Sequence, residues 1–214
     1  MNSADGLREL IARHGIREGS EEARRLFAYL ALLEKWNNGI NLTASTSWSS
    51  LARFFEEALW AARLYPQARV THIDIGSGAG FPAVPMRILR PAMRLLLVES
   101  RAKRAVFLET VTKELGLHGT EVVCRRAEEY LRSQPLPQFD IVSWKGLKLS
   151  SEALDGLLAA SKPETRLWLF HGAELPLEEP ATALKSLRLV QREHFPGRLI
   201  WQLSIYEFLA ECFT

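Results

Sequence analysis

The chain has 214 residues, of which 47% are hydrophobic and 24% charged, values that are typical of a folded globular protein. They exclude a largely disordered chain, and the absence of any run of about 18 uncharged apolar residues excludes a predicted transmembrane helix. Its two cysteines are too few for a disulfide framework or, alone, a zinc site, and the charged first twenty residues do not resemble a signal peptide. We therefore expect a soluble, cytoplasmic and monomeric protein without a metal site.

The net charge of +2 is unevenly distributed along the chain. Residues 81–132 contain ten Lys and Arg against six Asp and Glu, whereas residues 1–66 are balanced and residues 133–214 carry two more acidic than basic side chains. The middle of the chain is therefore where a polyanion would bind, although an ordinary solvated surface has a similar composition.

The first third of the chain is predicted to be helical. Ser20 is a suitable N-cap for a helix over residues 20–37, in which leucines recur at helical spacing. A second amphipathic helix is predicted over residues 49–64. We interpret residues 1–66 as an N-terminal helical extension and residues 67–214 as a separate domain.

Short apolar runs then alternate with helical stretches. The runs predicted as strands are residues 70–75, 95–98, 121–124, 139–144 and 167–170. Such alternation is typical of a doubly wound, mostly parallel sheet with helices on both faces. Two further alternating segments, joined by Pro196-Gly197, predict an antiparallel hairpin that completes the sheet.

The first predicted strand runs into a glycine-rich loop. Asp74 is followed by Gly76, Gly78 and Gly80, with Phe81 next and a predicted helix beyond. Glycines allow positive φ and a close approach of ligand to backbone, and the start of a helix presents free N–H groups. Phe81 occupies the position of the third glycine of a dinucleotide fingerprint, and the loop lacks the Lys and Ser/Thr of a P-loop. A dinucleotide and a nucleoside triphosphate are both disfavoured as ligands.

A carboxylate at the end of the second predicted strand adds to this pattern. Glu99 is placed to accept hydrogen bonds from both hydroxyls of a ribose. Together, Asp74, the G-x-G-x-G spacing and Glu99 suggest binding of S-adenosylmethionine, whose cationic amino group suits a nearby carboxylate. The alternative is a strand–turn–helix corner with structural glycines. Residues 125–129 are predicted to begin a short helix. Either a backbone N–H and a carboxylate there would hydrogen-bond to the edge of an adenine, or the acidic residues would only stabilise the N-terminus of the helix.

Some methyl-transfer reactions are disfavoured by the residues present. Residues 143–146 lack the Asn/Asp-Pro-Pro-aromatic pattern that usually accompanies methylation of the adenine amino group. Methylation of pyrimidine carbon 5 needs a cysteine nucleophile, but we interpret Cys124 as packed within a strand and Cys212 as terminal. A ring nitrogen with a free lone pair, such as guanine N7, needs no general base, and the sequence identifies no catalytic residue.

Several segments carry a resemblance to a known family. They are residues 35–43 (KWNNGINLT), 74–82 (DIGSGAGFP), 99–108 (ESRAKRAVFL) and 126–129 (RAEE). The chain resembles the RsmG (GidB) family of bacterial methyltransferases, which modify N7 of a guanine in 16S ribosomal RNA. The implied fold is a Rossmann-like class I S-adenosylmethionine-dependent methyltransferase, with a seven-stranded sheet that ends in an antiparallel hairpin.

The resemblance implies roles for individual residues. Those expected to bind S-adenosylmethionine are Asp74, Gly76, Gly78, Gly80, Phe81, Glu99, Ala127, Glu128 and Lys145. Within this set Glu99 would hold the ribose, Ala127 and Glu128 would border the adenine, and Lys145 would position cofactor or substrate. Those expected near the RNA are Arg53, Arg101, Lys103, Arg104 and His171. The implied partner is 16S ribosomal RNA or the small ribosomal subunit.

The chain departs from the family pattern at four positions that we expect to face the RNA. Lys145 and His171 stand where the family has Arg and Lys, and Phe54 and Glu57 stand where it has His and Asp. Lysine keeps the charge of arginine without its bidentate geometry, and histidine is mostly neutral near pH 7. The alternatives are therefore a divergent enzyme for another RNA or a small molecule, and a non-catalytic protein that binds cofactor and RNA.

Overall fold

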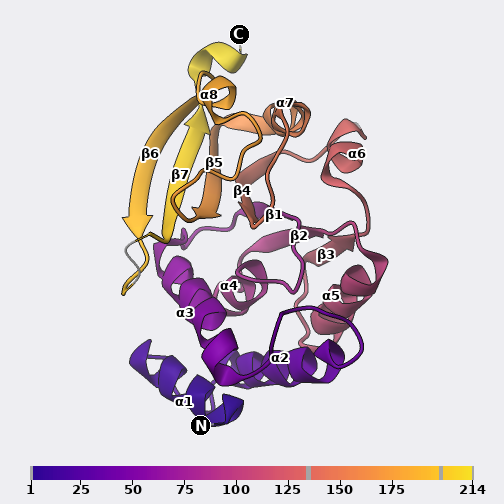
Figure 1. Cartoon of the computed structure of the whole chain (residues 1–214), viewed down its shortest axis with the longest axis vertical. Coiled ribbons are helices and arrows are strands. Elements are labelled where there is room, and N and C mark those ends of the chain that lie inside the picture. Colours follow the sequence, from indigo (N-terminus) through magenta and orange to yellow (C-terminus); the bar gives the residue numbers. More distant parts are fainter. Residues whose placement is uncertain (1, 134–135, 198–199, 214) are drawn as a thin grey trace.

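The computed structural model describes residues 2–133, 136–197 and 200–213, and its centre is a seven-stranded sheet (Figure 1). The strands are β1 (Thr71–Ile75), β2 (Arg94–Val98), β3 (Thr120–Val123), β4 (Phe139–Lys145), β5 (Ser161–His171), β6 (Leu187–His194) and β7 (Gln202–Phe208). Their order across the sheet is β3-β2-β1-β4-β5-β7-β6. Neighbours among β1 to β5 are parallel, whereas β7 is antiparallel to both β5 and β6, which confirms the predicted mixed sheet and hairpin.

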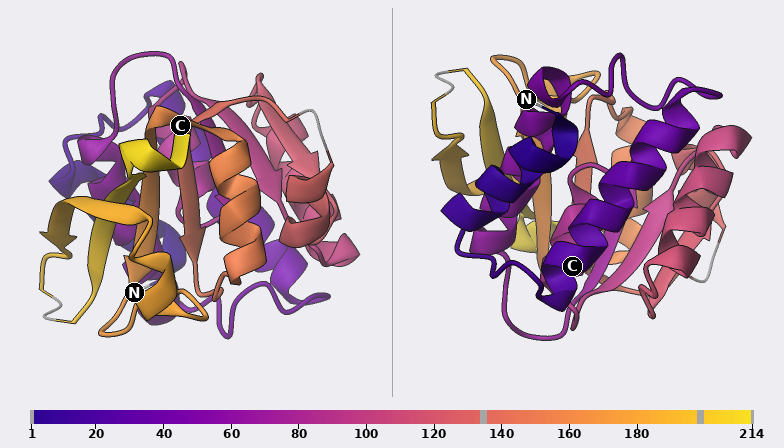
Figure 2. Two further views of the ribbon diagram at one scale, coloured as in Figure 1. Left: turned by 90° about the horizontal axis from the view of Figure 1, so that it is seen from above. Right: turned by 90° about the horizontal axis from the view of Figure 1, so that it is seen from below.

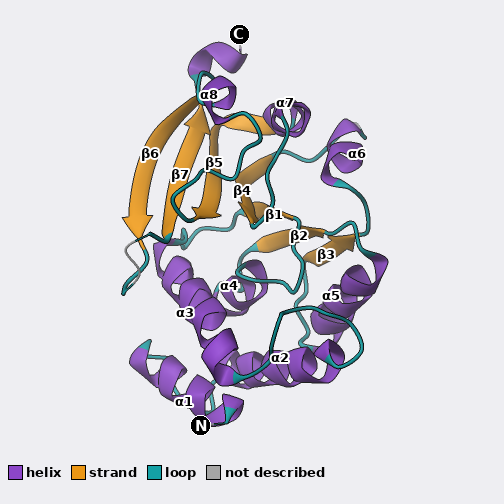
Figure 3. Cartoon of the chain, in the orientation of Figure 1, coloured by secondary structure: helices purple, strands orange, loops and turns teal. Residues whose placement is uncertain are grey.

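Helices cover both faces of this sheet, as the views from above and below in Figure 2 and the colouring of Figure 3 make clear. On one side lie α1 (Ser3–Arg13), α2 (Glu21–Asn37), α3 (Trp48–Leu64), α4 (Ala83–Leu89) and α5 (Ala102–Glu114). On the other lie α6 (Ala127–Arg132), α7 (Ser151–Ala159) and α8 (Pro180–Ala183), and a 3-10 helix spans Ala210–Phe213. None of the helices in the described ranges is long and apolar enough to cross a bilayer.

Each side of the sheet has its own hydrophobic core within the described residues. The core beneath α1 to α5 contains Leu26, Phe55 and Phe107, and the core beneath α6 to α8 contains Trp144 and Leu157. The helices of the first 66 residues therefore pack into the same core as one face of the sheet. The division into an extension and a domain stays a prediction.

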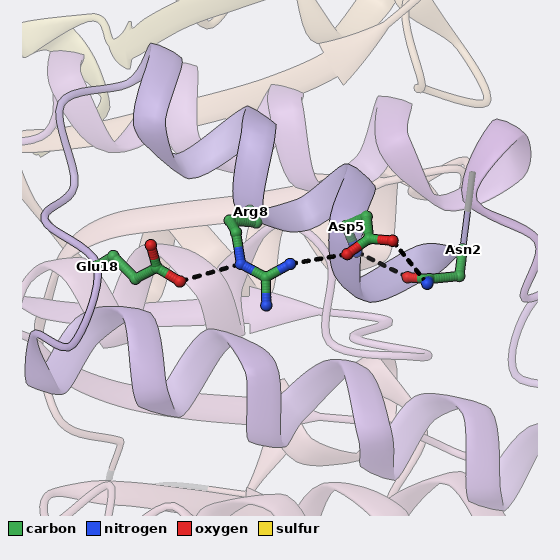
Figure 4. Close-up of polar contacts among 4 residues, drawn as sticks. All are labelled: Asn2, Asp5, Arg8 and Glu18. Carbon is green, nitrogen blue, oxygen red and sulfur yellow. Dashed lines mark hydrogen bonds and ion pairs between the residues drawn. The ribbon is translucent and has the colours of Figure 1, made fainter.

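A set of exposed polar contacts surrounds the start of α1 (Figure 4). Asn2 Oδ1 accepts a hydrogen bond from the Asp5 N–H at 2.8 Å and so caps the helix. Arg8 contacts Asp5 at 2.8 Å and Glu18, in the connection to α2, at 3.0 Å. Exposed ion pairs contribute little to stability, so we attribute the docking of α1 mainly to its buried apolar face.

One local interpretation from the sequence is wrong. β3 ends at Val123, opposite Val98 of β2, and Cys124 lies beyond the strand with an exposed side chain. β3 is the edge of the sheet and pairs only with β2, so its backbone pairing stops where β2 stops. Cys124 is thus exposed rather than packed inside a strand.

Candidate active site

A cavity of about 490 Å³ lies at the carboxyl ends of β1, β2 and β4. At this place the strand order reverses, because β1 is flanked by β2 on one side and β4 on the other. Ligands of open α/β sheets bind at such a switch point. The lining residues are Leu42, Thr43, Phe54, Gly76, Ser77, Gly78, Ala79, Phe81, Val98, Glu99, Ser100, Arg101, Arg104, Arg125, Arg126, Ala127, Glu128, Lys145, Gly146 and Leu147.

The loop between β1 and α4 forms one wall of this cavity. The N–H groups of Gly76 and Ser77 donate to the carbonyl of Val98 at 2.8 and 3.1 Å, which folds the loop back over the end of β2. Gly76 and Gly78 line the cavity with φ values of +71° and +57°, a region that favours glycine. The loop therefore presents bare backbone to a ligand at both positions.

Gly80 has a packing role instead. It is not among the described residues that line the cavity, and its φ is +93°. A Cβ at this position would lie 2.7 Å from Val84 Cγ2 and 3.2 Å from Leu108 Cδ2. The missing side chain lets α4 and α5 approach the loop closely, so Gly80 shapes the cavity without lining it.

The substitution Gly80→Ala is expected to lower the free energy of unfolding by about 2–4 kcal/mol, from backbone strain plus overpacking. Gly19 provides a matched control, because its φ is +80° but a Cβ there would meet nothing within 4 Å. Gly19→Ala should lose only about 1–2 kcal/mol, from the backbone alone. Urea unfolding of both variants measures the difference, and equal losses would contradict the packing role.

Tyr29 of α2 holds the same loop from the helical layer. Its hydroxyl donates to the carbonyl of Ala79 at 2.6 Å, and its ring lies 5.3 Å from that of Phe81. Burial raises the pKa of Tyr29 well above its ordinary value, so the hydroxyl stays protonated and remains a donor. The sequence alone does not reveal this role of Tyr29, because nothing local connects a helical tyrosine to a loop fifty residues away.

Glu99 joins the glycine loop to the helix that follows β2. Its Oε2 accepts from the Gly78 N–H and its Oε1 from the Arg101 N–H, both at 2.8 Å. The carboxylate is 4% exposed and lines the cavity. Because each carboxylate oxygen can accept more than one hydrogen bond, Glu99 also suits the hydroxyls of a ribose.

Asp74 lies behind the glycine loop. It is 2% exposed and is not among the cavity-lining residues of the described chain. Ser143 Oγ donates to its Oδ1 at 2.6 Å. Burial raises the pKa of Asp74 to about 7, while the Ser143 hydrogen bond and the charge of Lys145 act in the opposite direction. Asp74 therefore lies close enough to influence the cavity electrostatically, and its contact with the cofactor stays a prediction.

The connection between α2 and α3 covers another side of the cavity. Asn37 Oδ1 accepts from the N–H groups of Leu42 and Thr43 at 2.9 and 2.8 Å, and both of these residues line the cavity. Arg104 Nη2 donates to the Asn41 carbonyl at 2.9 Å and so ties this connection to α5. The segment 35–43, which carried part of the family resemblance, therefore builds a cavity wall.

Lys145, at the end of β4, belongs to a cluster of side chains from three distant segments. Its Nζ lies 2.5 Å from Glu57 Oε1, and Trp201 Nε1 donates to Glu57 Oε2. The ammonium also lies 4.8 Å from the ring centre of Phe54 and 5.4 Å from that of Trp201, within reach of cation–π attraction. Lys145 and Glu57, two of the four departures from the family pattern, are therefore ion-paired with each other.

Basic side chains gather beside the cavity. Arg101 and Arg104 line it and also line an adjoining groove of about 410 Å³, where Lys103 joins them. Arg125 and Arg126, just before α6, line the cavity as well and were not predicted as contacts with RNA. The sequence signal that could have identified them is the pair of adjacent arginines directly after a predicted strand.

The remaining predicted RNA residues differ in their placement. Arg53 is exposed on α3, with its guanidinium 4.5 Å from the ring centre of Phe54. His171 is only 4% exposed, and its ring nitrogens lie 2.9 Å from Ser204 Oγ and 2.8 Å from the Gly172 carbonyl. The end of β5 lies between β4 and β7, which buries His171, so the expected surface contact with RNA is wrong for this residue.

Comparison with known proteins gives the same assignment over most of the chain. Residues 22–194 match the family model GidB, described as rRNA small subunit methyltransferase G. The chain is 40% identical over 188 residues to Ribosomal RNA small subunit methyltransferase G of Roseiflexus sp., covering 87% of this chain and 78% of that protein. It is 34% identical over 195 residues to the protein of that name from Pseudomonas aeruginosa, covering 91% and 88%.

Solved structures agree at the level of the fold. A putative O-methyltransferase from Klebsiella pneumoniae superposes with a TM-score of 0.58 at 18% identity, covering 85% of this chain and 90% of that one. The putative methyltransferase yhhF from Escherichia coli gives a TM-score of 0.56 at 16% identity, covering 73% and 84%. The glycine loop, the sheet order and these matches lead to one assignment: the chain belongs to the rRNA small subunit methyltransferase G (GidB) family.

Proposed function

We propose that this protein transfers the methyl group of S-adenosylmethionine to N7 of a guanine in 16S ribosomal RNA. The family and the methyltransferase fold imply the use of S-adenosylmethionine. The observation that carries the proposal is the cavity at the switch point of the sheet, with its wall of bare glycine backbone and with Glu99 beside it.

The residues around this cavity fit the cofactor. Gly76 and Gly78 leave room for a ligand against the backbone, and Glu99 has acceptor capacity for ribose hydroxyls. Ala127 and Glu128 would border the adenine. When bound, S-adenosylmethionine supplies the methyl group from a positively charged sulfur.

Guanine N7 suits a site without a general base. The nitrogen carries a free lone pair and no proton, so its methylation needs alignment of the reactants but no proton removal. The methylated base is cationic, and an uncompensated positive charge beside it would oppose the reaction. Glu57 offsets the charge of Lys145, while the ammonium remains a donor suited to guanine O6, the acceptor next to N7 on the same edge. We therefore assign Lys145 to positioning of the base.

The charge around the cavity favours a polyanionic substrate. Arg101, Arg104, Arg125 and Arg126 line it, and the groove with Lys103 extends this basic surface. Such a surface attracts RNA phosphates, whereas a methyltransferase for a neutral small molecule would gain nothing from it.

Methyl transfer from labelled S-adenosylmethionine to small ribosomal subunits, and to naked 16S RNA, lacking the modification tests the proposal. After digestion we expect the label in 7-methylguanosine. Label in another nucleoside would indicate a divergent RNA methyltransferase. Absence of label, with cofactor binding verified in the same preparation, would indicate either an enzyme for a different substrate or a protein that binds without turnover.

Removal of two exposed charges is expected to weaken the binding of RNA selectively. In the double variant Arg101→Gln/Lys103→Gln, the affinity for 16S RNA at 0.1 M salt should fall roughly five- to tenfold, and the slope of log affinity against log salt should become shallower by about 1.5. Binding of S-adenosylmethionine should change little, because the backbone N–H of residue 101 still contacts Glu99.

Lys113→Gln is the matched control, since Lys113 is exposed in the last turn of the same helix. It should leave both the affinity and the salt slope unchanged. An equal loss in this control, or an unchanged salt slope in the double variant, would place the RNA elsewhere.

A further inference from the structure

Four buried polar side chains form a continuous hydrogen-bonded chain behind the glycine loop. Tyr65 Oη lies 3.1 Å from His72 Nδ1, His72 Nε2 lies 2.8 Å from Ser143 Oγ, and Ser143 Oγ donates to Asp74 Oδ1 at 2.6 Å. None of the four is more than 2% exposed. The chain runs from the end of α3 through β1 and β4 to the carboxylate that precedes the loop.

The protons in this chain have one arrangement when Asp74 is ionised. Ser143 has a single hydroxyl proton, which goes to Asp74, so its oxygen must accept from His72 Nε2–H. A neutral imidazole with its proton on Nε2 has an acceptor at Nδ1, and Tyr65 O–H donates there. His72 is neutral because burial lowers its pKa to about 3. All three hydrogen bonds therefore point toward the carboxylate.

We propose that Tyr65, His72 and Ser143 form a positioning chain that favours the ionised form of Asp74 behind the glycine loop and so strengthens cofactor binding without touching the cofactor. This inference rests on the proposed function, because it takes S-adenosylmethionine as the ligand. The cofactor carries a net positive charge, so a buried anion behind the loop attracts it. Hydrogen bonds donated to a carboxylate favour its charged form.

The ionisation of Asp74 is closely balanced, so this chain has a decisive influence on it. Burial raises the pKa of Asp74 to about 7, against the hydroxyls of Ser143 and Ser77 and the positive charge of Lys145. The negative charge of Glu99 acts in the same direction as burial. From α2, Tyr29 also faces Asp74 and is neutral, because burial raises its own pKa.

The far end of the chain also has charged neighbours. Burial raises the pKa of Tyr65 above its ordinary value, and the charge of Asp140 acts in the same direction while that of Arg87 opposes it. Tyr65 is therefore a neutral donor over the whole neutral range of pH. The group that changes charge near pH 7 is Asp74.

Protonation of Asp74 at Oδ1, the oxygen that accepts from Ser143, would reverse every hydrogen bond in the chain. The carboxyl O–H would donate to Ser143, Ser143 to His72 Nε2, and His72 Nδ1–H to Tyr65. The tautomer of His72 therefore reports the charge of Asp74.

The first test is ¹⁵N NMR of the histidine rings in the full chain without ligand. The protein has five histidines, and comparison with His72→Gln assigns the signal of His72. We expect the Nε2–H tautomer at pH 8.5 and conversion toward Nδ1–H as pH falls through about 7, where Asp74 takes up its proton. The Nδ1–H tautomer at pH 8.5 would overturn the proposal.

The second test is the dissociation constant of S-adenosylmethionine, measured by calorimetry between pH 6 and 9. His72→Phe keeps a ring but removes both nitrogens, so we expect the pH midpoint of binding to move up by about one and the affinity at pH 7.5 to fall about threefold. His72→Gln retains an amide donor toward Ser143 and should restore most of the affinity. The amino group of the cofactor titrates equally in every sample. Differences in the pH midpoint between variants therefore report only the effect of the hydrogen-bonded side chains.

Further variants keep the test decisive. Tyr65→Phe removes only the terminal hydroxyl and should move the pH midpoint of binding in the same direction by a smaller amount. This variant serves as the test if His72→Phe does not fold. Ser204→Ala is the control, because Ser204 is equally buried beside another histidine away from the glycine loop. An unchanged midpoint in both folded chain variants would overturn the proposal.

The two proposals can fail separately. If the wild-type protein binds no S-adenosylmethionine at any pH, the proposed function fails. The NMR experiment still shows the tautomer of His72 and so the direction of the hydrogen bonds. If the cofactor binds normally but the midpoint does not depend on His72 or Tyr65, only the positioning chain is rejected.

Discussion

Replacement of Glu57 by alanine is expected to lower the free energy of unfolding by about 3–5 kcal/mol, because removal of one partner from a buried ion pair leaves the other charge poorly compensated. The Glu57 side chain is 5% exposed and the Lys145 side chain 13%. The substitution also removes the acceptor of the Trp201 indole N–H. Urea unfolding at pH 7.5 measures the loss.

The neighbouring residue on the same helix is a matched control. Glu56 pairs with Arg13 at 3.6 Å, and these side chains are 35% and 66% exposed. Because water screens such a pair, Glu56→Ala should change the free energy of unfolding by no more than about 0.5 kcal/mol. A similar loss in both variants would mean that helix propensity, and not the ion pair, is being measured.

A double-mutant cycle separates the ion pair from its surroundings. Lys145→Ala combined with Glu57→Ala should lose less stability than the sum of the single losses, with a coupling energy of about 2 kcal/mol. Additive losses would show that the two charges do not depend on each other. That result would also remove the charge compensation on which the role of Lys145 in guanine positioning is based.

Titration of His72, taken by itself, is expected to contribute a loss of about 4 kcal/mol to the free energy of unfolding between pH 8 and pH 3. Burial lowers the pKa of His72 from its ordinary value of 6.5 to about 3. A group whose pKa is lowered by folding contributes stability that is present above pH 6.5 and is lost as pH falls toward the folded value. The protein must bury a charged imidazole or unfold.

Asp74 acts in the opposite sense over an overlapping range of pH. Folding raises its pKa from 3.8 to about 7, so its contribution to stability is present below pH 3.8 and is lost as pH rises through about 7. The free energy of unfolding of the wild-type protein therefore changes with pH only by the difference between the effects of His72 and Asp74. His72→Gln removes one of them, and this variant should be less stable than wild type at pH 8 yet lose less stability on acidification.

Urea unfolding of wild type and His72→Gln at intervals between pH 8 and pH 4 measures this effect. Ser204→Ala removes an equally buried polar group that does not titrate, and should lower stability by a constant amount at every pH. Parallel curves for wild type and His72→Gln would contradict the burial of a neutral imidazole.

The fold was largely predictable because its signals are local. Five strands read as short apolar runs, the Pro196-Gly197 turn marks the hairpin, and the predicted helices over residues 20–37 and 49–64 correspond to α2 and α3. Ser20 caps α2 as predicted, accepting from the Ala23 N–H at 3.1 Å. Hydrophobic period and capping chemistry act over a few residues, so one sequence contains them in full.

The candidate site was predictable only where its residues follow the loops at strand ends. Gly76, Gly78 and Glu99 were found because the carboxyl ends of parallel strands meet at one edge. His171 and Cys124 were misplaced, since their exposure depends on which strand lies beside them and where its pairing stops. Gly80 was assigned to ligand contact, although the atoms that a Cβ at this position would meet come from α2, α4 and α5.

The glycine motif, the acidic strand end and the segment 35–43 were therefore sufficient for the family and the fold, because each is contiguous in the chain. The partnership of Glu57 with Lys145 and Trp201 joins residues 88 and 144 positions apart. The chain from Tyr65 to Asp74 needs β1 and β4 side by side in one register. Such contacts arise from the packing of elements, in which side chains a few ångströms apart share no sequence period, and they pair two of the departures from the family pattern, Glu57 and Lys145, with each other.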